Sequence, residues 1–141
     1  MERSRWSTTT SWEELAEHAT PSGGTFSYFA IGEPGAAGSP TVVKVSFPPG
    51  SRVESHTHAC DYCEILLEGS ETVTRTLHRA GDILIRKAGT VYGPLIAGPE
   101  GVTKLLIFTD DRVQAISPNS EPGSADQLRM DQVLSGWSEQ E

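Results

Sequence analysis

The chain has 141 residues, with 11 lysines and arginines against 19 aspartates and glutamates, and a formal net charge of −8. This length suits one domain with one core. The acidic balance argues against nucleic acid or an anionic membrane surface as the main partner, since both require a basic footprint. No segment approaches the roughly 20 apolar residues of a membrane span. The polar start "MERSRWSTTTSWEE" lacks the apolar stretch of a secretion signal, so we expect a cytoplasmic protein.

Residues 1–25 predict an N-terminal arm that contains a short helix. The stretch "SWEELAEHA", residues 11–19, favours a helix because Ser11 and Glu14 have the spacing of a capping box and apolar residues recur at helical intervals. The following "TPSGGTF" contains the proline and glycines that end such a helix.

Residues 26–112 predict an all-β barrel. Short runs rich in branched and aromatic residues follow one another: "TFSYFAIG", "TVVKVSF", "SRVESHTH", "YCEILLEG", "ETVTRTL", "DILIRKA" and "VTKLLIFT". Glycine or proline separates them, in "PPG", "EGS", "RAGD", "AGTVYGP" and "AGPEG". Many short strands with regular turn signals are typical of an antiparallel sandwich or barrel.

Residues 113–141 predict a linker and a C-terminal helix. The composition of "SPNSEPGSAD" is that of a linker. The later "QLRMDQVLSGW", residues 127–137, has apolar residues at helical spacing, and we expect this helix to pack on the barrel or on a second subunit.

The pair His56 and His58 is the first candidate for chemistry. If "SRVESHTH" is a strand, both side chains share one face and lie about 6.6 Å apart along it, so two imidazoles can converge on one metal ion. Imidazole suits Fe, Ni, Cu or Zn. The alternative is two solvated histidines on an outer sheet face.

The frame around this pair resembles the cupin family, whose motifs are G-x5-H-x-H-x3-E-x6-G and G-x5-P-x-G-x2-H-x3-N. The matching positions are Gly50, His56, His58, Gly69, Gly81 and Gly89. The resemblance covers about half of the chain. It implies a double-stranded β-helix, or jelly-roll, barrel, a divalent metal at the barrel mouth and a homodimer. The short N- and C-terminal helices predicted above lie outside this barrel.

The chain departs from the cupin motifs at four positions. Tyr62 stands where the family has Glu, and Tyr92 where it has the later His; Lys87 replaces the Pro and Ile96 the final Asn. Two usual ligands are thus phenols, and a neutral phenol is a poor metal ligand with a reference pKa near 10.

Glu64 is the candidate for the missing carboxylate. If Tyr62 points into the barrel, strand alternation points Glu64 and Leu66 inward as well. A carboxylate in an apolar interior requires a partner, and a metal on His56 and His58 is one. The set His56, His58 and Glu64 is an arrangement associated with non-haem iron. Alternatively, Glu64 pairs with an arginine, Arg75 or Arg86, and never touches metal.

Cys60 and Cys63 form a C-x-x-C that is open to three interpretations. A redox pair normally precedes a helix, whereas here a strand follows. A closed structural Zn site with the two histidines strains the geometry. We favour one loop cysteine and one cysteine buried on the other face of the sheet. His18 and His78 are expected to be solvated.

Two function classes follow. A divalent metal, Fe(II) first and otherwise Ni, Zn or Mn, would polarise a carbonyl or enolate oxygen of a small-molecule substrate, with Tyr62, Tyr92 and Glu64 as catalytic residues. Such an enzyme would be an oxygenase, or a redox-neutral isomerase, cyclase or lyase. Here a weaker resemblance, in "AGTVYGPLIAGPEGVTKLLIF", is to dihydroxyacetophenone and diketone dioxygenases and to the anti-sigma-factor cupin domain. The second class is a non-catalytic cupin that binds a small molecule or holds Zn. In either case we expect a homodimer, with Trp6, Trp12 and Trp137 covering sheet edges.

Overall fold

The computed structural model describes residues 2–3, 7–33, 36, 38–113 and 115–118, and these residues form strands joined by turns and loops. The strands are β1 (Glu2–Arg3), β2 (Thr8–Thr9), β3 (His18–Ala19), β4 (Thr25–Ala30), β5 (Thr41–Phe47), β6 (Arg52–Val53), β7 (Tyr62–Val73), β8 (Thr76–Arg79), β9 (Ile83–Arg86) and β10 (Leu95–Phe108). The all-β class and the jelly-roll architecture predicted from the sequence are confirmed.

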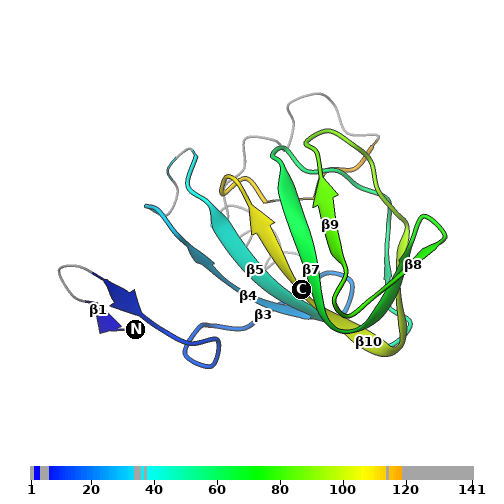
Figure 1. Ribbon diagram of the computed structural model, residues 1–141, viewed down its shortest axis with the longest axis horizontal. Coiled ribbons are helices and arrows are strands. Elements are labelled where there is room, and N and C mark those ends of the chain that lie inside the picture. Colours follow the sequence, from blue (N-terminus) through cyan, green and yellow to red (C-terminus); the bar gives the residue numbers. More distant parts are fainter. Residues whose placement is uncertain (1, 4–6, 34–35, 37, 114, 119–141) are drawn as a thin grey trace.

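Eight of these strands form one antiparallel sheet, in the order β3-β4-β5-β10-β7-β8. Strand β6 pairs with β10, and β9 pairs with β7. In Figure 1 the sheet curves strongly, and β8 and part of β10 fold over on the right to partly enclose an interior. Strands β1 and β2 form a separate two-stranded sheet at the blue end of the chain.

The two longest strands run through segments that the sequence predicted as turns. Strand β7 continues across Gly69, and β10 continues across the "AGPEG" stretch. Their ladder shifts register between Ala97 and Val102 and again between Thr103 and Lys104. The glycines therefore mark bulges, which bend a strand and disturb its pairing without ending it.

The segment that carries His56 and His58 is less regular than predicted. Only Arg52 and Val53 of "SRVESHTH" form a strand, and His56 then makes an isolated antiparallel bridge with Tyr92. This segment has few partners in the strand ladder, because β6 pairs with β10 at only two residue positions. A turn precedes β6, and a loop follows the histidines.

The helix predicted for residues 11–19 is wrong. The amide of Glu14 does hydrogen-bond to the hydroxyl of Ser11 (3.3 Å), as a capping box requires, but the chain makes a single turn and then enters β3. One turn fixes several dihedral angles for few hydrogen bonds, and pairing of β3 with β4 supplies an alternative. The predicted helix at 127–137 lies outside the described residues.

Two apolar clusters fill the sheet's inner face. The larger is built from β4, β5, β7, β10 and the loop before β7, and the smaller sits at the bend. Their buried members are Phe26, Val43, Val45, Cys60, Tyr62 and Phe108, and Leu66, Ala97 and Val102. In the described part of the chain, no helix is long and apolar enough to cross a membrane.

Candidate functional site

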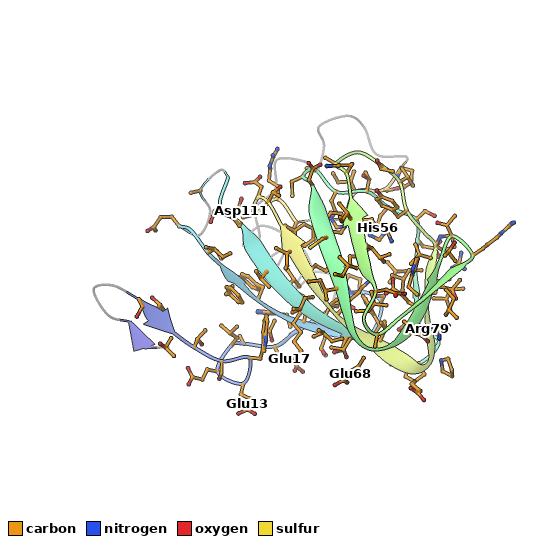
Figure 2. All side chains as sticks on the ribbon, viewed as in Figure 1. Glu13, Glu17, His56, Glu68, Arg79 and Asp111 are labelled. Carbon is orange, nitrogen blue, oxygen red and sulfur yellow. The ribbon has the colours of Figure 1, made fainter. Side chains whose placement is uncertain are left out.

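His56 is held at the wall of the barrel by its own backbone. Its amide donates to the carbonyl of Tyr92 and its carbonyl accepts from the amide of Tyr92, both at 2.9 Å. Its ring Nδ1 lies 2.8 Å from the carbonyl oxygen of Glu54. A carbonyl can only accept, so Nδ1 carries the hydrogen and the Nε2 of the neutral ring has the free lone pair. In Figure 2, His56 lies on the concave side of the sheet.

His58 lies deeper, in a group of rings. It is 7% exposed, and its ring centroid lies 5.0 Å from that of His56, with the two ring planes perpendicular. The rings of Tyr62 and Phe108 lie 4.7 and 5.2 Å from His58 and stack on each other at 4.8 Å. These distances are those of favourable edge-to-face and stacked aromatic pairs.

Tyr62 points inward, as predicted. Burial, with a smaller contribution from the charge of Glu64, raises the pKa of the Tyr62 phenol above its ordinary value. The phenol is therefore protonated at neutral pH, and it acts as a hydrogen-bond donor rather than as an anionic metal ligand.

Glu64 also points inward, and its two oxygens are held by two cations. Nζ of Lys104 lies 2.6 Å from Oε1, and Nε of Arg86 donates to Oε2 at 2.9 Å. Burial by itself raises the pKa of Glu64, but the pairing with Lys104 and Arg86 outweighs burial and lowers the pKa. Of the two arginine partners considered for Glu64, the structure pairs it with Arg86; Arg75 is exposed at a turn.

Lys104 and Glu71 were missed in the sequence. Lys104 is 2% exposed and also lies 2.8 Å from Oε1 of Glu71, which is fully buried. Both residues follow the bulges in β10 and β7, so alternation counted from Tyr62 assigns Glu71 to the wrong face. The available signal was Gly69, two residues before Glu71, because a bulge at such a glycine shifts the alternation.

Tyr92 lies at the edge of the same site. The guanidinium carbon of Arg86 lies 4.0 Å above the Tyr92 ring, which is cation–π geometry. The phenol oxygen accepts a hydrogen bond from the amide of Lys87 at 3.2 Å. Tyr92 is half-buried, and its backbone pairing with His56 places the two residues side by side.

All five predicted site residues line one cavity of about 580 Å³, a size typical of small-molecule sites. These are His56, His58, Tyr62, Glu64 and Tyr92, and the charged residues Arg86 and Lys104 join them. The remaining wall is largely apolar, with contributions from β4, β5 and β10 such as Phe26, Val45 and Leu106.

The described residues do not fit a resident metal with three protein ligands. His56 and His58 supply two imidazoles, but both oxygens of Glu64 face cations and the phenol of Tyr62 is protonated. Within the described ranges, no group of three His, Cys, Asp or Glu side chains is arranged to hold a metal ion. The ligand set of His56, His58 and Glu64 thus stays a prediction, since it requires Glu64 to leave its ion pairs.

The cysteines lie outside this cavity wall. Cys60 is buried in the larger apolar cluster, with Sγ 3.8 Å from the carbonyl oxygen of Arg112, and burial raises the pKa of its thiol. Cys63 lies on the outer face of β7 but is partly exposed rather than buried as predicted, and both are free thiols. His18 and His78 are half-buried rather than solvated: His18 packs on Phe26 at a ring distance of 5.1 Å.

Comparison with protein-family models found no match, and comparison with curated proteins found none either. Solved structures do match. An RmlC-like cupin from Shewanella frigidimarina NCIMB 400 superposes with a TM-score of 0.60 at 16% identity, covering 78% of this chain and 91% of that one.

Two further matches belong to longer chains. A mutant of Bacillus subtilis oxalate decarboxylase gives a TM-score of 0.57 at 22% identity, covering 79% of this chain and 30% of that one. A chain in the complex of Rhodobacter sphaeroides SigE with the anti-sigma ChrR gives 0.54 at 19% identity, covering 70% and 51%. At these identities the likeness establishes the fold.

Proposed function

From the premise that this chain has the cupin fold, we propose that it binds a small organic molecule in the barrel cavity. The cavity itself is the observation that carries the proposal. It combines a largely apolar wall with His56, His58, Tyr62 and Tyr92 on one side. Apolar walls with a few convergent polar groups are the usual composition of small-molecule sites.

The polar side of the cavity suits a molecule with a carbonyl, enol or phenolic oxygen. The protonated phenol of Tyr62 is a hydrogen-bond donor, and so is the guanidinium of Arg86. The ring group of His58, Tyr62 and Phe108 suits an unsaturated or aromatic body, because aromatic rings pack favourably edge-to-face and offset-stacked.

The test uses two fluorescent probes of equal shape, 1-naphthamide and 1-naphthoate, titrated into the purified protein. Leu106→Trp places a large side chain at the cavity wall, and we expect it to abolish binding. Leu105→Trp is the matched control, because Leu105 is the neighbouring residue of β10 and does not line the cavity. Binding that survives Leu106→Trp, or no binding of either probe, contradicts the proposal.

A metal-dependent enzyme that acts on the same class of molecule is the second candidate, with Tyr62, Tyr92 and Glu64 in the catalytic roles predicted for them. One observation favours it: the perpendicular rings of His56 and His58, 5.0 Å apart, both line the cavity. This second candidate requires protein ligands for the metal in addition to those that the described residues provide.

Elemental analysis after incubation with Fe(II), Ni, Zn or Mn separates the two candidates. If the second is right, one metal per chain is retained and His58→Ala removes most of it, whereas His78→Ala, on β8 and away from the cavity, does not. If the protein takes up no metal, the metal-dependent enzyme is ruled out and only the binding function remains.

A further inference from the structure

Arg86 is held in one orientation by two contacts. Nε donates to Glu64 Oε2 at 2.9 Å, and the guanidinium carbon stands 4.0 Å above the ring of Tyr92. Its side chain is 12% exposed and lines the cavity. Arg86 is the last residue of β9 and pairs in register with Tyr62 of β7. The strand ladder therefore fixes its backbone as well.

Most of the donors of Arg86 have no acceptor among the residues that the structure describes. A guanidinium carries five N–H groups. Within the described ranges, only the Nε–H of Arg86 makes a hydrogen bond. The two Nη atoms belong to a side chain that lines the cavity, and neither is among the buried side-chain atoms without a partner, so their four N–H groups remain accessible there. A molecule in the cavity is the natural acceptor.

The charged residues of the cavity wall are paired with one another or with a buried neighbour. Three cations line the cavity against two carboxylates: Arg52, Arg86 and Lys104 against Glu54 and Glu64. Arg52 pairs with Glu54 at 2.8 Å at an exposed position, so the inner wall has Arg86 and Lys104 against Glu64.

Glu71, the second partner of Lys104, does not line the cavity. Together, Glu64 and Glu71 balance the two cations. The preference for an anion therefore comes from the unused Nη donors of Arg86, since a carboxylate oxygen accepts strongly from a guanidinium.

We infer that the cavity selects a molecule with a planar oxyanion on an unsaturated body, and that Arg86 is the residue that binds the oxyanion. The chemistry is that of a carboxylate, or of an enol or phenol that ionises on binding. The fixed fork of an arginine matches two oxygens of a carboxylate, and hydrogen bonds between charged groups are stronger than neutral ones. This inference rests on the proposed function and specifies its ligand.

The experiment compares the two naphthalene probes in wild-type protein and in variants. 1-Naphthoate and 1-naphthamide differ in the charge of one group, so the ratio of their dissociation constants isolates the oxyanion. In wild-type protein we expect 1-naphthoate to bind at least about tenfold more tightly, which corresponds to about 1.4 kcal/mol.

Arg86→Gln should bring the ratio close to one, because it should weaken the binding of 1-naphthoate much more than the binding of 1-naphthamide. Arg86→Lys keeps the charge without the fork, so it should restore part of the ratio. Arg79→Gln, on β8 and away from the cavity, is the control and should keep the wild-type ratio. Thermal unfolding checks that each variant is folded. If Arg86→Gln does not fold, Arg86→Lys takes its place as the test variant.

The outcomes separate this inference from the proposed function. If 1-naphthamide binds as tightly as 1-naphthoate, or if the preference survives the loss of the Arg86 charge, the inference is wrong and the binding function stands. If neither probe binds, both are wrong.

Discussion

Glu64 is the residue on which the charge balance of the barrel interior depends. One carboxylate is shared by Lys104 and Arg86, and Lys104 is shared in turn with Glu71. A buried charge that loses its partner is costly, so these four residues behave as a unit. The same pairing that lowers the pKa of Glu64 keeps it from serving freely as a metal ligand.

Glu64→Gln should lower the free energy of unfolding at pH 7 by about 3 kcal/mol, since it leaves two buried cations short of a carboxylate. The pKa of Glu64 is lower in the folded chain than its ordinary value of 4.5. Its ionised form therefore contributes fully above that value, and the contribution is lost as the pH falls through the folded pKa.

The variant should consequently show a flatter dependence of stability on pH in the acid range, measured by urea unfolding at a series of pH values. Glu68→Gln, on an exposed position of the same strand, is the control and should change stability by less than about 0.5 kcal/mol. An unchanged acid dependence in Glu64→Gln would show that the ion pairs do not stabilise the fold.

At the scale of the element, the bend shared by β7 and β10 shapes the cavity. Gly69 has a φ of +76° and packs directly against the backbone of Gly101, whose φ is +77°. After this point the inward positions change from Tyr62, Glu64 and Leu66 to Glu71 and Val73. The bulge therefore brings Glu71 to the inner face, where it meets Lys104.

Gly69→Ala should destabilise the protein by more than the cost of backbone strain. A Cβ at this position clashes with the carbonyl oxygen of Gly101, whereas a Cβ at Gly89, with a φ of +79°, meets nothing within 4 Å. Gly89→Ala thus measures the strain of about 1–3 kcal/mol that a left-handed backbone costs a residue with a side chain. Equal losses in the two variants, measured by thermal unfolding, would mean that the close approach at Gly69 relaxes.

At the scale of the whole molecule, β9 leaves an apolar edge. Ile83 and Ile85 are 63% and 74% exposed, while Leu84 and Arg86 point inward. Among the described strands, β9 pairs with β7 alone. An exposed apolar edge strand is prone to association, and a second copy of the chain is the occupant that closes it symmetrically. Trp12, predicted as an edge cover, packs on Phe29 at 5.6 Å, and Trp6 and Trp137 lie outside the described residues.

We expect a homodimer in which β9 contributes to the interface. Ile85→Lys should shift the protein toward monomer in sedimentation velocity across a concentration series. Ile31→Lys introduces the same charge at a residue that is 66% exposed in the loop after β4, and should leave association unchanged. A wild-type protein that is monomeric at every concentration would refute the dimer.

The local sequence pattern was sufficient to predict the fold and the inward direction of several cavity side chains. The His-x-His pair and the glycine frame indicated the jelly-roll fold, and alternation along the unbroken start of β7 correctly placed Tyr62, Glu64 and Leu66 inside. The reason is that side-chain direction in a regular strand has a period of two, which can be counted along the chain. The same counting failed beyond Gly69, because a bulge shifts the count.

Only the tertiary structure decided which charges meet. "DILIRKA" favours burial of its isoleucines, yet the register that opposes Glu64 to Leu84 and Tyr62 to Arg86 turns Ile83 and Ile85 outward. Likewise, both faces of "VTKLLIFT" carry apolar residues, so the strand does not indicate that Lys104 points inward. The choice depends on pairing between strands distant in sequence, where a buried carboxylate requires a cation, and that requirement appears only once the strands are side by side.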